Sequence, residues 1–245
     1  MTSLVFEAEI SPGMTSREAV DLARLAGLQP RRSQITELVE WYARELERLD
    51  VRVQVNTPMS GDDVAAANAD AVILATGSQP AATGFQRQLA MVDTMPGVDA
   101  KNVWSIDDVM ANRARLGSTV VLLDDTGDWR GGGTAWHLAE RGHRVVIVTP
   151  HPMVGFWLQR TAGDGNLRAT LAKLGTIWHT ESAITEWQGD RAMVRSLLDG
   201  SVTEVPADAL VLSTTNVADT TVFDELGERV ANVTQVGDAV APRLA

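Results

Sequence analysis

The chain has 245 residues and no cysteine, and its 21 Lys and Arg are outweighed by 32 Asp and Glu, for a formal net charge of −11. Without cysteine it can form no disulfide framework, thiolate-ligated metal centre or redox dithiol, so redox chemistry would require a bound organic cofactor. The acidic balance argues against a nucleic-acid-binding surface. No signal-peptide pattern and no apolar run near the ~20 residues of a membrane helix is present, so we expect a cytoplasmic chain with neither nucleic acid nor membrane as partner.

Short apolar segments rich in β-branched residues recur along the chain and predict β-strands. In chain order they are residues 4–6, 51–55, 71–74, 119–123, 145–148 and 209–212. The segments at 71–74 and 145–148 are apolar almost throughout, which is typical of strands buried on both faces of a parallel sheet.

Amphipathic stretches lie between several of these segments and predict helices. The strongest is residues 33–49, which starts at Ser33 with Glu37 nearby. Its apolar face consists of Ile35, Leu38, Val39, Tyr42, Leu46 and Leu49. Two more helices are predicted at 134–141 and 165–174, and each is followed by a glycine that is a suitable helix end.

Strands that alternate with helices predict an α/β fold with a Rossmann-like, mostly parallel sheet. Residues 184–205 instead alternate in polarity and are interrupted by turn residues, which indicates a small antiparallel β-meander. Because no flexible linker is present, the second domain is expected to be inserted into the first. The predicted division is an outer domain of residues 1–114 and 207–245, incomplete at both ends, and a smaller βαβ-plus-meander domain of residues 115–206.

A glycine-rich turn follows the predicted strand at 119–123 and leads into a helix. This order is typical of dinucleotide-binding units, where glycines let the backbone approach a pyrophosphate and the helix N-terminus attracts it. Asp125, Gly127 and Gly131 are the candidate residues. However, the G-x-G-x-x-G pattern is absent, and Asp124, Asp125 and Asp128 would repel a phosphate. A nicotinamide nucleotide site and a crossover whose glycines serve packing both remain open, and the acids disfavour the first.

Two strand ends supply further candidates. Residues 69–77 end in Ala75, Thr76 and Gly77, a turn of small residues at the carboxyl end of a strand, where open α/β sheets bind ligands. Residues 233–239 bring Gly237 and Asp238 to the same edge. The glycine allows close backbone approach, and the carboxylate can accept hydrogen bonds from sugar hydroxyls.

One acidic residue near the start of the chain is also a candidate. Glu7 follows the first apolar segment, and an acid at the end of the second strand of a Rossmann sheet typically binds the adenosine ribose. A solvated strand end is the alternative interpretation.

No catalytic acid, base or nucleophile is assigned from the sequence, and no metal site is expected. The four histidines show no i,i+4 pair and no accompanying carboxylate pattern. No serine lies in G-x-S-x-G, and the only tyrosine, Tyr42, is not followed by lysine four residues later.

Taken together in this order, residues 58–64, 69–77, 124–128 and 236–243 resemble a known module. It is the C-terminal FAD/NAD(P)-binding, pyridine nucleotide-disulfide oxidoreductase-like module of the 2,4-dienoyl-CoA reductase and trimethylamine dehydrogenase family, relatives of old yellow enzyme. The resemblance covers nearly the whole chain. It implies that the outer domain binds FAD or only ADP and that the inserted domain is of the NAD(P)H-binding type.

The resemblance also implies roles for the candidate residues. Glu7 would bind ribose, residues 75–77 would line the adenine nucleotide, and Gly237 and Asp238 would match the flavin-binding pair. In this family an N-terminal barrel holds FMN and the substrate. The family's first strand and G-x-G-x-x-G turn would precede Leu4, and its last helix would follow Arg243, so the chain is expected to be truncated at both ends.

We therefore expect a flavoprotein oxidoreductase component, a nucleotide-binding and electron-transfer module. Its expected partner is a chain that carries the FMN barrel, the missing G-x-G-x-x-G segment, or both. The alternative is a non-catalytic structural or degenerate subunit with weak or no nucleotide binding.

Overall fold

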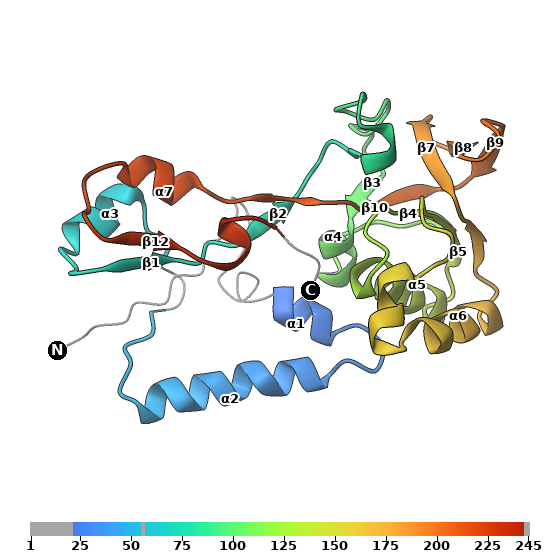
Figure 1. The fold of residues 1–245 in the computed structure, drawn as a ribbon. Helices are drawn as coiled ribbons and strands as arrows, with labels where there is room; N and C mark the ends of the chain where they lie inside the picture. The colour runs from blue at the N-terminus through green and yellow to red at the C-terminus, as the bar shows by residue number, and fades with distance from the viewer. Residues whose placement is uncertain (1–21, 55–56, 243–245) are drawn as a thin grey trace. The chain divides into compact units, whose positions relative to one another are not determined.

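The computed structural model describes residues 22–54 and 57–242 (Figure 1). They form a mixed α/β structure with a parallel sheet, which confirms the predicted fold class. The chain divides into two compact units. The first unit consists of the described parts of Met1–Gly27, Ser33–Gln79 and Asn216–Arg243, and the second unit of Leu28–Arg32 and Pro80–Thr215.

The helices and strands have the following bounds. The α-helices are α1 Leu22–Gly27, α2 Gln34–Arg48, α3 Gly61–Ala66, α4 Ile106–Met110, α5 Trp129–Glu140, α6 Asp164–Lys173 and α7 Thr221–Leu226. The strands are β1 Val72–Leu74, β2 Ser78–Pro80, β3 Val103–Ser105, β4 Thr119–Asp124, β5 Arg144–Val148, β6 Ile177–His179, β7 Ser182–Trp187, β8 Arg191–Ser196, β9 Val202–Pro206, β10 Ala209–Ser213, β11 Asn216–Ala218 and β12 Val233–Gln235. Short 3-10 helices occupy Arg87–Leu89, Phe156–Thr161 and Gly237–Ala239.

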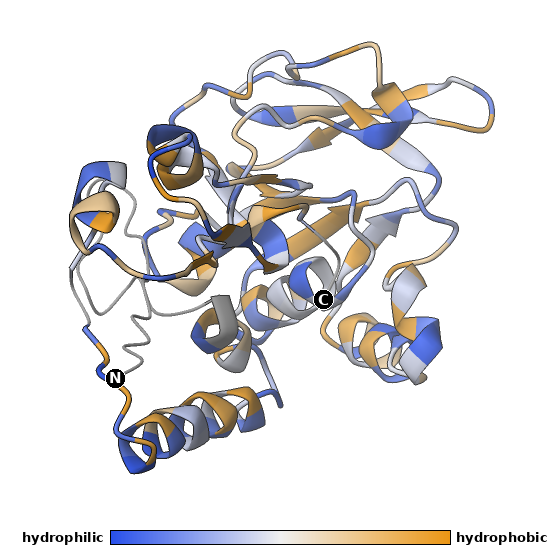
Figure 2. Ribbon diagram, turned by 60° about the vertical axis from the view of Figure 1, so that its left-hand side comes forward, coloured by the Kyte–Doolittle hydropathy of each residue, from blue (hydrophilic) through white to orange (hydrophobic). Residues whose placement is uncertain are grey.

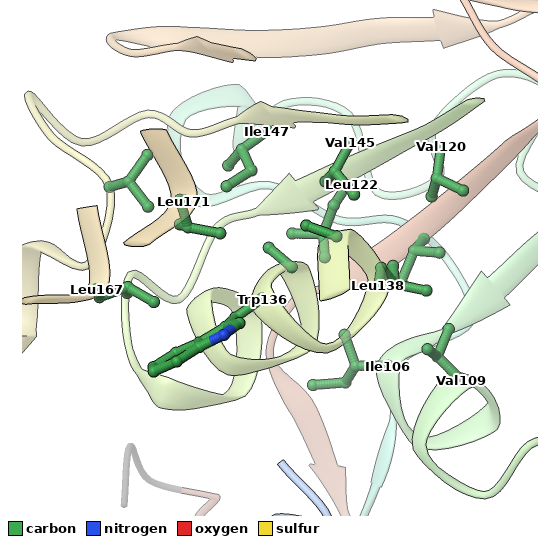
Figure 3. Close-up of a cluster of buried hydrophobic side chains, with 14 of the residues drawn as sticks. Ile106, Val109, Val120, Leu122, Trp136, Leu138, Val145, Ile147, Leu167 and Leu171 are labelled. Atoms are coloured by element: carbon green, nitrogen blue, oxygen red, sulfur yellow. The ribbon is translucent and has the colours of Figure 1, made fainter. Parts of the chain in front are cut away.

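The second unit is built on a five-stranded parallel sheet in the order β3-β10-β4-β5-β6. Successive residues of β4 and β5 point to opposite faces, and both faces are covered. On one face, side chains of β4 and β5 pack against α4, α5 and α6 (Figure 3). The other face packs against the antiparallel meander of β7, β8 and β9, as expected from the sequence.

The division of the chain differs from the predicted one. The units change at residues 79/80 and 215/216 rather than at 114/115 and 206/207. The reason is β3, a three-residue strand that pairs with β10 at the edge of the central sheet. Pairing places the whole segment that carries β3 in the second unit, and the sequence showed no apolar run there.

The first unit has a smaller sheet, in which β1 and β12 pair in parallel. Val64 of α3, Leu74 of β1 and Val222 and Leu226 of α7 form its buried cluster. A strand was predicted at 51–55, but residues 51–54 form none in the structure, so that prediction was wrong for the described part. The predicted strand at 4–6 and Glu7 lie outside the described residues.

Helix α2 confirms the amphipathic helix predicted at 33–49, yet none of its residues is buried. Leu38 is 53% exposed, Trp41 46% and Tyr42 54%. Figure 2 shows hydrophobic and hydrophilic residues side by side along this helix. A 15-residue helix usually gains most of its stability by burying its apolar face, so this face is a candidate contact surface. Across the described part of the chain, no helix combines the length and apolar character needed to cross a membrane.

Candidate functional site

The carboxyl ends of β1 and β12 bring two of the predicted segments together in the first unit. The strands are parallel, with Val72 opposite Val233 and Leu74 opposite Gln235. Beyond them, the backbone N–H of Val236 donates to the carbonyl oxygen of Leu74 at 2.9 Å. The turn at 75–77 and the Gly237–Asp238 pair therefore lie at the same sheet edge, as the sequence predicts.

Side-chain hydrogen bonds connect these two turns. The Ser78 hydroxyl donates to Asp238 Oδ2 at 3.1 Å and accepts from Asn216 Nδ2 at 2.9 Å. Thr76 Oγ1 donates to the backbone oxygen of Asp219 at 2.6 Å. Ser78 and Asn216 were not predicted as site residues, because isolated small polar residues carry no periodic signal. The position of Ser78 directly after Ala-Thr-Gly is the one indication that the sequence offered.

The two glycines of this edge leave their backbone accessible. Gly77 and Gly237 have φ angles of +77° and +65°, and a Cβ at either position would have no neighbouring atom within 4 Å. A ligand can therefore approach this backbone closely, while Asp238 offers a hydrogen-bond acceptor beside it. These residues fit the sugar and phosphate groups of a nucleotide.

The second predicted place is the turn between β4 and α5, and the chain's own carboxylates fill it. Asp124 is fully buried and accepts hydrogen bonds from the Gly127 N–H at 2.9 Å and from Thr126 Oγ1 at 3.1 Å. Asp128 caps α5 by accepting from the Arg130 N–H at 2.9 Å. Thr126 joins the two acids, since its hydroxyl also lies 3.0 Å from Asp128 Oδ1.

Asp125 is held from the other side of this turn. Arg87 Nε donates to Asp125 Oδ2 at 2.8 Å, and a second guanidinium nitrogen donates to the backbone oxygen of Asp125. The Asp125 side chain is buried, whereas Arg87 remains 40% exposed. Asp125 is therefore committed to an internal ion pair. Arg87, 38 residues earlier in the chain, was not predicted as its partner.

Burial dominates the protonation behaviour of this turn. It raises the pKa of Asp124 to about 7, and the charge of Asp128 adds to this rise while the hydrogen bonds from Gly127 and Thr126 oppose it. His151 lies beside Gly127. Burial lowers the pKa of this histidine, which favours its neutral form at pH 7. Such pKa shifts occur in functional sites and in structural networks alike. Among the described residues, no cluster of His, Asp and Glu is arranged to hold a metal ion.

No family model matches the chain. Among curated proteins, it is 32% identical over 125 residues to the N,N-dimethylglycine/sarcosine dehydrogenase of Chromohalobacter salexigens, a match of 51% of this chain and 17% of that protein. It is 28% identical over 205 residues to the cinnamate reductase of Clostridium sporogenes, with 82% of this chain and 28% of the reductase covered. The chain thus spans well under half the length of these relatives.

Solved structures give a more complete match to this chain. The histamine dehydrogenase of Rhizobium sp. 4-9 superposes with a TM-score of 0.87 at 25% identity, over 99% of this chain and 37% of that one. The 6-hydroxypseudooxynicotine amine oxidase of Pseudomonas geniculata N1 gives a TM-score of 0.84 at 25% identity, over 89% of this chain and 33% of that one. The resemblance of this chain to the FAD/NAD(P)-binding module of the 2,4-dienoyl-CoA reductase and trimethylamine dehydrogenase family, predicted from its sequence, is thereby confirmed.

Proposed function

We propose that this chain is the nucleotide-binding and electron-transfer module of a flavoprotein oxidoreductase and that it holds FAD or ADP at the edge formed by β1 and β12. One observation carries the proposal: the turn at 75–77 and the pair Gly237 and Asp238 meet at this edge with open backbone and a joined polar network. The relatives named above are dehydrogenases, a reductase and an oxidase.

The residues of this edge would bind and orient the nucleotide. Gly77 and Gly237 would admit its phosphates to the backbone, and Asp238 would accept a hydrogen bond from a sugar hydroxyl. Ser78 fixes the Asp238 carboxylate by its hydrogen bond, so the acceptor is positioned before the ligand arrives. A bound flavin would supply the redox chemistry, while the chain contributes binding, orientation and exclusion of solvent.

A partner polypeptide is part of this proposal. The chain matches about a third of the length of the solved structures it resembles, and we propose that it acts together with a protein that carries a flavin barrel. Two features of the first unit support such a contact. The apolar face of α2 is exposed, and among the described residues the sheet of β1 and β12 has two strands, which is marginal for an independent sheet.

Binding of ADP tests the proposal directly. ADP or FAD is expected to raise the melting temperature of the full chain, alone or with an old-yellow-enzyme-like barrel protein as its partner, because a ligand that binds only the folded state stabilises it. A melting temperature that neither ADP nor FAD changes, with or without the barrel protein, would contradict the proposal.

Replacement of Asp238 by alanine is expected to weaken binding of ADP or FAD about 5- to 150-fold, since loss of one hydrogen-bond acceptor costs about 1–3 kcal/mol. Titration calorimetry measures the change. Asp70→Ala is the matched control, because it removes the same charge from an exposed position just before β1, at the opposite end of the strand. Equal affinities of the two variants would show that Asp238 does not face the nucleotide.

A structural subunit without nucleotide affinity is the second candidate function. It is favoured by the acidic turn of the second unit, where buried carboxylates occupy the place expected for a pyrophosphate. Failure of the chain to bind FAD, ADP, NADH and NADPH, even with its partner, would select this alternative.

A further inference from the structure

The glycines around the N-terminus of α5 are explained by the chain's own atoms. A Cβ at Gly131 would overlap Oδ1 of Asp124, and one at Gly132 would overlap the Leu167 side chain. At Gly133 it would overlap the Gln29 amide, and at Gly127 the ring of His151. Each glycine therefore makes room for an internal side chain, which leaves its backbone covered, unlike that of Gly77 and Gly237.

Two N–H groups at and just before this helix start are also occupied. A dinucleotide pyrophosphate binds a helix N-terminus because the first N–H groups have no partner within the helix. In this chain the Gly127 N–H donates to Asp124 and the Arg130 N–H donates to Asp128. A phosphate would have to displace two buried carboxylates from donors that they already satisfy.

Electrostatics act in the same direction. Asp124 Oδ2, Asp125 Oδ1 and Asp128 Oδ2 are buried and have no hydrogen-bond partner among the described residues. Positive charge beside this turn already faces these acids. Arg87 pairs with Asp125, and Arg32, whose guanidinium lies 5.0 Å from the centre of the Trp129 ring, attracts Asp128. Buried like charges interact strongly, so a pyrophosphate would meet a repulsive site.

We infer that the second unit is closed to dinucleotides: Asp124 and Asp128 replace a pyrophosphate at the start of α5, and NADH and NADPH do not bind there. The glycine-rich turn keeps the geometry of a nucleotide-binding crossover but uses it for internal packing. Asp125, Gly127 and Gly131 are structural residues in this assignment. Reducing equivalents therefore do not enter through a nicotinamide nucleotide bound at α5.

Amide chemical shifts of the isotope-labelled full chain test this inference. With NADH, NADPH or inorganic pyrophosphate at millimolar concentration, the amide chemical shifts of Gly127, Arg130 and Gly131 are expected to remain unchanged. Saturable shifts at these amides in the wild type would overturn the inference. Shifts at Gly77 and Gly237 would report binding in the first unit, so the proposed function and this inference can fail separately.

Neutral variants test the role of the acids. Asp124→Asn combined with Asp128→Asn removes the charge of Asp128 and the charge that Asp124 carries above its pKa of about 7, and it retains side-chain oxygens that can accept from the same N–H groups. This double variant is expected to bind pyrophosphate at least about tenfold more tightly than the wild type, because like-charge repulsion is relieved. Asp128→Asn alone is a milder version, since asparagine is itself a good helix N-cap.

The matched control is Asp190→Asn, which removes one charge from an exposed turn between β7 and β8. It is expected to leave pyrophosphate binding unchanged. Comparison with Asp128→Asn, which also removes one charge, then excludes an effect of net charge alone. The double variant could keep the wild-type pattern of backbone amide signals and still fail to bind pyrophosphate. That result would contradict the inference that these two carboxylates exclude the pyrophosphate.

Discussion

Replacement of Asp124 by asparagine is expected to raise the free energy of unfolding near pH 8 by on the order of 2–4 kcal/mol. Burial and the charge of Asp128 raise the pKa of the Asp124 carboxyl from 3.8 to about 7 in the folded chain. Between these two values the folded chain binds a proton that the unfolded chain releases. Stability therefore falls as the pH rises from about 4 to about 7, and the loss is complete above that range. Asparagine carries no charge and escapes this loss.

Urea unfolding of wild type and variant at about pH 5 and about pH 8 measures the effect, and the gain is expected to be clearly smaller at the lower pH. His151 has a lowered pKa and makes the wild type lose stability toward low pH, but the difference between variant and wild type removes this contribution. Asp190→Asn is the control. Because the hydrogen bond with Arg191 lowers the pKa of Asp190, its neutral variant is expected to gain nothing. If the Asp124→Asn protein has wild-type stability at both pH values, the pKa of Asp124 is not raised by burial and the charge of Asp128.

The sequence predicted the central sheet well because burial on both faces leaves a simple pattern. β4, β5 and β10 match the apolar runs at 119–123, 145–148 and 209–212 to within a residue. It predicted the adjacency of residues 75–77 with Gly237 and Asp238 for a related reason, since parallel strands present their carboxyl ends at one edge.

Helix α5 shows where such patterns fail. The sequence placed its start at residue 134, but the helix begins at Trp129 and includes three consecutive glycines, which are poor helix formers. Tertiary packing overrides propensity in this helix, because Asp124, Leu167 and Gln29 press against the backbone at those positions. None of these contacts is encoded in local periodicity.

The strand predicted at 51–55 is wrong for its described part, because a local pattern alone does not make a strand. Its alternation of valines with polar residues is typical of a strand, but a strand also needs a hydrogen-bonded neighbour. Residues 51–54 have no strand partner among the described residues. The pattern therefore indicates a preference for extended structure, whereas the pairing depends on another segment of chain.

Replacement of Gly97 by alanine is expected to destabilise the second unit by about 3–5 kcal/mol. Gly97 has a φ angle of +81°, and a Cβ there would overlap the backbone oxygen of Trp187. The contact is tight because the Trp187 N–H donates to the Pro96 oxygen at 2.9 Å, while the Trp187 side chain is only 2% exposed. The added methyl group must therefore displace the end of β7, break this hydrogen bond and disturb a buried tryptophan.

Gly189→Ala separates that overlap from backbone strain. Gly189 lies two residues beyond Trp187 with a φ angle of +89°, and a Cβ there would meet nothing within 4 Å. Its variant is expected to lose only about 1 kcal/mol, the cost of a left-handed conformation for a residue with a side chain. Urea unfolding followed by tryptophan fluorescence compares the two variants. Equal losses would mean that the backbone around Gly97 relaxes freely, so that the meander is held to the sheet by its apolar side chains rather than by this backbone contact.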